Sequence, residues 1–187
     1  MTKINPRGIN TVTGQATNVS PSDNYVKEGG GYIVSPIVTT TVYKSAGQSI
    51  PVNPGSAVAT FDVELTDNEG FHDNVTNNTR LTIPAAFDGK FVELIGYVQL
   101  TTTNPEGFRM LINHYNSADA LISSPGRWSS VTTAAEAECQ VFTPPVLVST
   151  GDYFELRVDN HSHNTKGFSS GTIGIDGTRF TIIVRDL

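Results

Sequence analysis

Repeated alternation of apolar and polar residues from about residue 38 onward is the feature that most constrains how this chain can fold. In the stretch FVELIGYVQL (91–100), every second position from Val92 to Leu100 is apolar or glycine. Successive side chains of a strand point to opposite faces, so a period of two predicts a strand with one buried face. The same period recurs, with varying strictness, at 38–45, 59–67, 80–84, 108–115, 152–159 and 179–187.

Two of these segments predict which side chains are buried. In ATFDVELTD (59–67), we expect Phe61, Val63 and Leu65 to point into the core. In FRMLINHY (108–115), the inward set is Phe108, Met110 and Ile112, with Arg109, Leu111 and Asn113 on the opposite face.

Short turn signals rich in Gly, Pro, Asn and Asp separate the segments. Along the chain they read DNEG, FDGK, TNPEG, SSPG, TPP and STGD. We expect about eight strands at a spacing of about 10 to 15 residues and no amphipathic helix. TTAAEAECQV (132–141) is helix-like by propensity, but it is short and flanked by Thr and Pro, so we interpret it as strand or loop. The predicted fold class is all-β, an antiparallel sandwich.

Composition limits the classes of protein to which such a sandwich can belong. A length of 187 residues suits one domain, or one domain with an arm, and a hydrophobic content of 37% is lean enough to suit an oligomer. The net charge of -6 and the lack of any basic run argue against a nucleic-acid partner. Cys139 is the only cysteine, so no intrachain disulfide can form.

The sequence gives no reason to expect a membrane partner. The start, MTKINPRGIN, lacks the apolar core of a signal peptide, and no apolar run reaches the roughly 18 residues that a membrane span needs. We therefore expect synthesis and folding in a cytoplasm.

Residues 1–38 differ from the rest and predict an extended N-terminal arm with a short strand at 32–34. They contain three prolines and a glycine triplet at 29–31, and neither a helical nor an alternating period persists. A tail that only solvates would carry more charge. This one carries apolar residues at intervals, which we interpret as partner-binding: Ile4, Ile9, Val12, Val19 and Tyr25. A tail with no role is the alternative.

Four residues interrupt the polar faces of the predicted strands: Tyr97, Leu111, Tyr153 and Ile183. A monomer also exposes scattered apolar residues, so this pattern alone does not require a partner. A self-associating sheet shows the same mixture, and the four are candidates for a seam with another copy.

Several stretches together resemble a known family. They are VYKSAGQSIP, TFDVELTDNEGFHDNVTNNTRLTIP, GKFVELIGYVQL, VSTGDYFELRV and TRFTIIVRDL. These are similar to the trimeric jelly roll of the complement C1q/tumour necrosis factor type, and more narrowly to versions in bacteriophage virion proteins and some bacterial surface proteins. The resemblance covers residues 39–187, and the arm has no counterpart in it.

The resemblance implies a ten-strand jelly roll in two sheets and a compact homotrimer with aromatic residues at the seam. It also implies a non-enzymatic role without a cofactor. Phage versions decorate the capsid or cap a tail or head fibre. One fold hosts many functions, so this step is an analogy.

A His-Asp pair, His72 and Asp73, is the first candidate for chemistry. No nucleophile elbow and no His-Glu-x-x-His motif accompanies it, and neighbouring residues of an extended chain point to opposite faces. We expect Asp73 and the following asparagines to satisfy backbone groups of a turn.

A second candidate is DNHSH, in which Asp159, His161 and His163 alternate. In a strand all three would share one face, as a metal site requires. The segment runs into a loop, where this period need not hold, so we predict no metal.

A third candidate is the loop layer, which carries Arg127, Trp128, Lys166 and Phe168. Aromatic and polar residues on loops of a rigid scaffold can bind sugars or proteins. Alternatively, Trp128 fills the core or the seam.

We therefore predict a bacteriophage virion structural protein. It would be a trimeric capsid decoration, cement or head-fibre protein, located in the virion and attached by its arm to the major capsid protein or another virion protein. The alternative is the receptor- or glycan-binding tip of a phage fibre, whose loops grip a host surface glycan or protein. An enzyme is not expected, because the catalytic motifs are missing.

Overall fold

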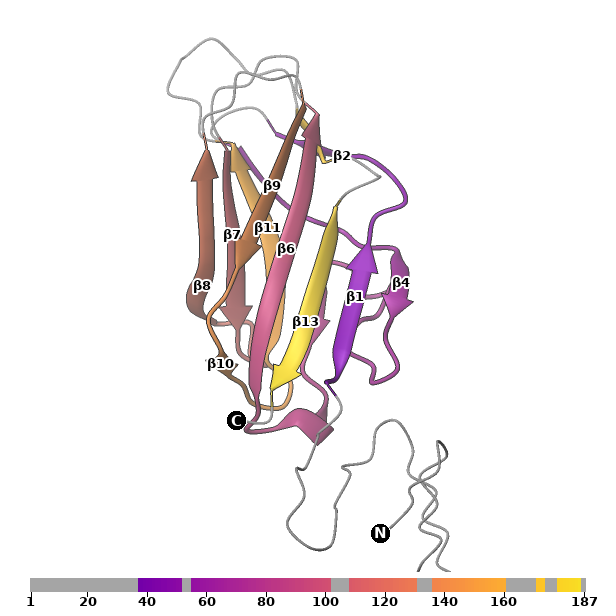
Figure 1. The fold of residues 1–187 in the computed structure, drawn as a ribbon, viewed down its shortest axis with the longest axis vertical. Helices are drawn as coiled ribbons and strands as arrows, with labels where there is room; N and C mark the ends of the chain where they lie inside the picture. Colours follow the sequence, from indigo (N-terminus) through magenta and orange to yellow (C-terminus); the bar gives the residue numbers. More distant parts are fainter. Residues whose placement is uncertain are drawn as a thin grey trace, which may run out of the picture. The chain divides into compact units, whose positions relative to one another are not determined.

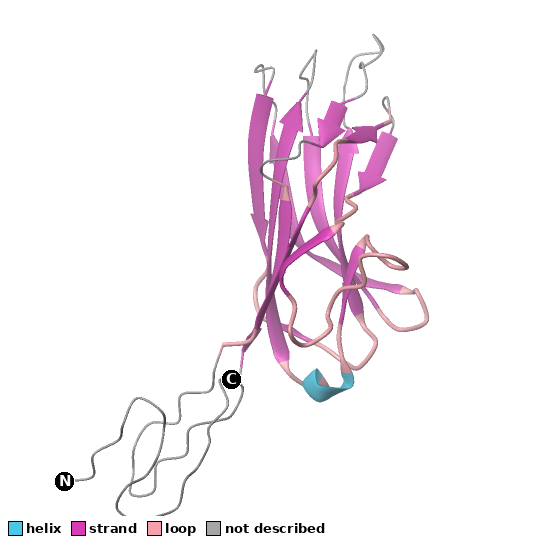
Figure 2. Ribbon diagram, turned by 90° about the vertical axis from the view of Figure 1, so that its right-hand side faces the viewer, coloured by secondary structure: helices cyan, strands magenta, loops and turns pink. Residues whose placement is uncertain are grey.

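Two antiparallel β-sheets packed face to face are formed by the described residues of this computed structural model (Figures 1 and 2). The structure describes residues 37–51, 55–101, 108–130, 136–160, 171–173 and 178–185. The proposed arm contacts Ile4, Ile9, Val12, Val19 and Tyr25, and the short strand at 32–34, lie outside this part of the chain.

The first sheet has eight strands. Six of them are hydrogen-bonded neighbours in the order β2-β12-β6-β13-β1-β4, and β9 and β10 also pair with β6. Its last long strand, β13, lies between β6 and β1, so Thr39 pairs with Ile183 across almost the whole domain sequence (Figure 1). The bounds are β1 Thr39–Tyr43, β2 Gln48–Ile50, β4 Val63–Thr66, β6 Phe91–Thr101, β9 Glu136–Phe142, β10 Val146–Leu147, β12 Gly171–Ile173 and β13 Arg179–Arg185.

The second sheet has five strands in the order β3-β11-β7-β8, with β5 also paired to β11. A 3-10 turn, η1 (Ala85–Phe87), precedes β6. The bounds are β3 Gly55–Val58, β5 Arg80–Thr82, β7 Phe108–Tyr115, β8 Leu121–Ser130 and β11 Tyr153–Asn160.

The core lies between the sheets and follows the predicted alternation. On β6, Val92, Leu94 and Val98 are fully buried, and Gly96 takes the third inward position, between Leu94 and Val98. A Cβ atom on Gly96 would lie 2.6 Å from Leu156 Cδ1, so only glycine fits here without movement of the facing sheet. The side chain of Leu100, the fifth predicted position, lies outside the described set.

Three predicted turn signals contain a glycine with positive φ. These are Gly70 of DNEG at +75°, Gly89 of FDGK at +69° and Gly151 of STGD at +81°. Glycine adopts this region without the steric cost that other residues meet. The turn chemistry read from the sequence is therefore confirmed at these three positions.

The burial predicted for 59–67 is wrong at Leu65, which is 60% exposed. Phe61 is fully buried, but it precedes β4. The pairing of β4 with β1 shifts register between Thr41 and Val42, and it sets Glu64 opposite the buried Val42. The register shift disturbs the regular alternation of β4, so both Glu64 and Leu65 are exposed and only Val63 is half-buried.

The prediction of a loop around SSPG is also wrong, because residues 121–130 form the single strand β8. Proline has no N–H to donate, and Pro125 is tolerated because β8 is the edge of its sheet. The actual turn lies earlier, where Asn116 Oδ1 accepts the N–H groups of Ala118 and Ala120.

The strand β7 is buried on both faces rather than on one. Met110 and Ile112 are buried as predicted, but Leu111 and Asn113 are buried too. The residues paired with Leu111 are Arg157 and Arg127, and Ser124 donates a hydrogen bond to Asn113. Long side chains of neighbouring strands therefore cover positions that sequence alternation alone would expose.

Candidate functional site

The outer face of the eight-stranded sheet carries a row of residues that the strand register aligns side by side. Thr41, Thr181, Ile95 and Phe142 are successive partners across β1, β13, β6 and β9. The two threonines share a hydrogen bond of 3.0 Å between their hydroxyls. The β6 and β9 end of this row is therefore apolar, and Phe142 is exposed.

Neighbouring rows extend the apolar surface and bound it with charge. Leu147 of β10 pairs with Phe91 of β6, and both Phe142 and Leu147 are 58% exposed. Beside Phe91, Arg185 donates to Glu93 with an Nη2–Oε2 distance of 2.7 Å. We call Phe91, Ile95, Phe142 and Leu147 the apolar face.

One row further along, Tyr97 lies beneath a cation. The guanidinium of Arg179 is 5.4 Å from the centroid of the Tyr97 ring. A hydrogen bond to Glu138 raises the pKa of Tyr97 above its ordinary value. Aromatic and arginine side chains around an exposed apolar patch are typical of the surfaces through which proteins associate.

The four proposed seam residues divide between two surfaces. Tyr97 and Ile183 lie on the outer side of the eight-stranded sheet, on β6 and β13. Leu111 and Tyr153 lie on β7 and β11 of the other sheet. The four therefore cannot form one flat seam.

Tyr153 is enclosed within its own sheet. Its ring stacks on the ring of Tyr115 with centroids 4.9 Å apart. The guanidinium of Arg80, on β5, lies 4.4 Å from the centroid of the Tyr153 ring. Burial, followed by a hydrogen bond to Asp119, raises the pKa of Tyr153 to about 12. These contacts within one chain explain why an aromatic residue occupies an outward position, so Tyr153 does not require contact with another copy of the chain.

His72 and Asp73 have separate structural tasks. Asp73 Oδ1 accepts the N–H groups of Val75 and Thr76, as the Asx-turn prediction requires. His72 is buried, and its Nδ1 lies 3.2 Å from Glu64 Oε1. The pair does not act on a common group.

Asp67 organises the same loop, and sequence reasoning did not find this role. Its two carboxylate oxygens accept the N–H groups of Phe71 and His72, and one also accepts the Thr40 hydroxyl. The only sequence signal was its place at the start of DNEG.

A second buried His-carboxylate pair was also not predicted. His114 Nε2 lies 3.1 Å from Asp152 Oδ2, and the His114 ring stacks on Phe154 at 4.4 Å. Asp152 also accepts the N–H of Ser149. Both side chains lie in the core, so the pair braces β7 against the turn before β11.

Asp159 belongs to an ion-pair network on β11. It accepts hydrogen bonds from Arg109 and Arg157. His161 and His163 lie outside the described residues, and the described residues contain no group of three or more metal-ligating side chains.

Only two of the four loop candidates, Arg127 and Trp128, lie among the described residues. Arg127 and Trp128 lie in strand β8, not in a loop, and Trp128 pairs with the buried Met110. Lys166 and Phe168 lie outside the described residues.

Comparison with known proteins identifies the fold. No family model and no curated protein matches the sequence. The globular domain of zebrafish complement 1qA aligns with a TM-score of 0.51 and 7% identity, covering 80% of this chain and 96% of that one. Murine APRIL at pH 8.0 aligns with a TM-score of 0.53 and 8% identity, covering 80% and 99%. The fold is a jelly roll of the C1q/TNF type.

This C1q/TNF-type jelly roll confirms the predicted all-β, antiparallel fold class. Identities below 10% carry no information about ligands or partners. Within the described residues, no helix is both long and apolar enough to span a membrane.

Proposed function

We propose that this chain is a non-enzymatic structural protein that works as a homotrimer. We further propose that it is a bacteriophage virion protein, acting as a capsid decoration, cement or head-fibre protein attached through residues 1–38. The apolar face on the outer side of the eight-stranded sheet carries the proposal of self-association. The virion context rests on the sequence resemblance and on the spaced apolar residues of the arm.

Burial of the apolar face supplies a driving force for association. Phe142 and Leu147 lie on adjacent strand segments and are 58% exposed in a single chain. Fully burying one such side chain stabilises by about 1.5–3 kcal/mol relative to leaving it in water. In a closed ring each copy contributes the same patch, so the gain is repeated in every subunit.

The chemistry of the buried histidines supports a role without catalysis. Each of His72 and His114 contacts a carboxylate inside the folded chain, where it connects loops and strands. A catalytic pair needs an accessible reacting group beside it, and neither histidine is exposed.

Measurement of mass in solution tests the self-association. We expect a species of three times 20.1 kDa, and a monomer for Phe142→Asp, because a charge would have to be buried at the interface. Val75→Asp places the same charge at an exposed turn position and should leave the mass unchanged. A wild-type monomer at working concentrations would contradict the proposal.

Deletion of residues 1–38 tests the virion role separately. The shortened protein should still self-associate but should no longer join phage particles. If the shortened protein instead binds host cells as the full chain does, the receptor- or glycan-binding alternative is favoured. Of that alternative's three loops, those after residues 101 and 161 lie outside the described residues, and the one after residue 123 is part of strand β8.

A further inference from the structure

The outer face of the five-stranded sheet carries cationic side chains, unlike the apolar face of the other sheet. One row of partners across β3, β11, β7 and β8 reads Val58, Arg157, Leu111 and Arg127. Apolar and cationic side chains therefore alternate across four strands. Neighbouring strands lie about 4.8 Å apart, so the two arginine backbones are separated by about 10 Å.

A buried carboxylate orients two of the arginines on this face. In the adjacent row Asp159 pairs with Arg109, whose Nε donates to Asp159 Oδ2 at 3.0 Å, while Arg157 Nε donates to Oδ1. The side chain of Asp159 is 5% exposed, against 27% for Arg109 and 38% for Arg157. The carboxylate lies underneath and both guanidinium groups reach solvent.

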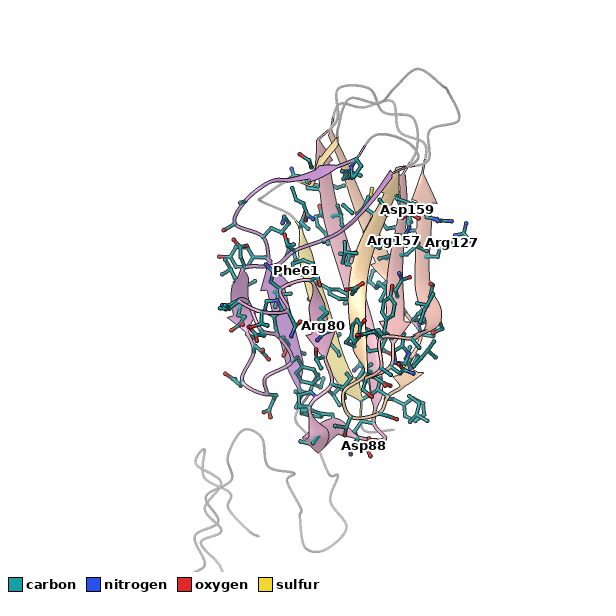
Figure 3. The ribbon with its side chains drawn as sticks, turned by 180° about the vertical axis from the view of Figure 1, so that it is seen from behind. Phe61, Arg80, Asp88, Arg127, Arg157 and Asp159 are labelled. Carbon is teal, nitrogen blue, oxygen red and sulfur yellow. The ribbon has the colours of Figure 1, made fainter. Side chains whose placement is uncertain are left out.

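Arg127 completes the group on the edge strand. It is exposed, and no ion pair joins it to another residue of the described segments. Figure 3 shows Arg127, Arg157 and Asp159 at the same end of this sheet, with Arg80 further along it. Three guanidinium groups and the carboxylates of Asp159 and Glu155 thus lie around Leu111, although the whole chain has a net charge of -6.

We propose that Arg109, Arg127 and Arg157 form a binding site for an acidic polysaccharide that crosses the strands above Leu111. Guanidinium groups bind carboxylates and sulfates through paired hydrogen bonds. The step from one strand to the next is close to the length of one sugar ring. A polysaccharide with an acidic group on every second sugar would therefore place its charges on Arg157 and Arg127, whose side chains cover the buried Leu111 between them.

A nucleic acid fits this face less well. Single strands bind through open aromatic rings on which bases stack. Tyr153 is covered by Tyr115 on one side and Arg80 on the other. In the described part of this face, the arginines supply positive charge, but the Tyr153 ring is not free for a base to stack on it.

Titration calorimetry of the full chain at low salt tests the site. We expect hyaluronate oligosaccharides or heparin to bind and neutral dextran not to bind. Arg127→Gln should weaken binding about tenfold or more, since hydrogen bonds to charged groups are the strong ones. Arg157→Gln should act in the same direction, and added salt should weaken binding in all cases.

Lys90→Gln is the matched control, since it removes one positive charge outside the arginine group and should leave affinity unchanged. Arg127 is exposed, so its replacement should not alter thermal unfolding, which is measured in parallel. Phe142→Asp should bind with wild-type affinity per chain, because one chain contains the whole site; this separates the inference from the proposed trimer.

Three results would overturn the inference. They are no binding of either acidic polysaccharide, an equal loss of affinity in Lys90→Gln and Arg127→Gln, or binding of poly-glutamate as tightly as of the polysaccharides. The last result would assign the face to an acidic protein segment.

Discussion

Several buried polar residues of this jelly roll are held by specific hydrogen-bond partners, although the buried His72 Nε2 and Arg80 Nε have none among the described residues. Lys44 is buried, and its Nζ donates to the Thr60 carbonyl at 2.8 Å and to the Thr60 hydroxyl. Burial lowers the pKa of Lys44 below its ordinary value, while nearby Asp62 opposes this effect. Such residues have strong individual effects on stability, because removal of one partner leaves a buried polar group unsatisfied.

Gly96→Ala should destabilise the fold. The new Cβ would meet Leu156 Cδ1 at 2.6 Å and Val141 Cγ1 at 2.9 Å, so the two sheets would have to move apart locally. Overpacking of this kind costs about 1–3 kcal/mol. Urea unfolding measures the loss, and Ser49→Ala on an exposed position of β2 serves as the control. Equal stability of the Gly96→Ala protein would show that the sheets are less tightly packed than described.

Glu155 should make stability fall as pH rises above about 4.5. Burial raises the pKa of Glu155 above its ordinary value of 4.5, despite the Thr79 hydrogen bond and the charge of Arg80. The folded state therefore binds the proton more tightly than the unfolded state, and this contribution is lost as pH increases.

Unfolding free energies of wild type and Glu155→Gln between pH 4 and pH 7 provide the measurement. The variant should lose less stability across this range than wild type does. Glu69→Gln should follow wild type, and an identical slope for Glu155→Gln would refute the assignment.

At the scale of elements, the strands that follow a regular period were predictable and the irregular ones were not. β6 and β13 alternate cleanly, so their buried residues followed from the sequence. β8 contains Ser, Pro and Gly, which favour a turn locally, and only its place at a sheet edge makes a strand possible. The register shift between β1 and β4 depends on tertiary pairing, which no local pattern contains.

The candidate surfaces were less predictable than the fold for the same reason. Arg157, Leu111 and Arg127 come from three strands, and they form one row only through the register of β11, β7 and β8. The sequence marked Arg127 and Leu111 individually but gave them different roles. Alignment of side chains across strands requires the pairing itself.

Asn116→Ala should weaken the turn between β7 and β8. The Asn116 side-chain oxygen accepts two backbone N–H groups, and Asp119 in the same turn has a φ of +60°. Loss of these hydrogen bonds should lower the unfolding free energy by about 1 kcal/mol. Asn116→Asp keeps the acceptor and should retain most of the stability in the same urea titration. A larger loss for Asn116→Asp than for Asn116→Ala would contradict this role.

At the scale of the whole molecule, the two sheets present surfaces of different chemistry. The eight-stranded sheet carries the apolar face around Ile95 and Phe142, and the five-stranded sheet carries the arginine group around Leu111. A jelly roll that self-associates through the first surface would leave the second available to solvent.

The melting temperature of a self-associating chain should rise with protein concentration, because association stabilises the folded state by mass action. Differential scanning calorimetry over a hundredfold range of wild-type concentration measures this effect. Phe142→Asp should melt at one temperature throughout the range. A wild-type melting temperature independent of concentration would argue against self-association.

The place of β13 between β6 and β1 has a consequence for how the chain acquires its structure. Residues 39–43 find one of their two neighbouring strands only in residues 179–185, which are synthesised much later. Contacts between such distant segments slow folding, since a long loop must close before any pairing compensates for its entropy. The early strands therefore emerge from the ribosome with an unpaired edge. Until β13 has been synthesised, the rest of the chain or chaperones must protect this edge from aggregation.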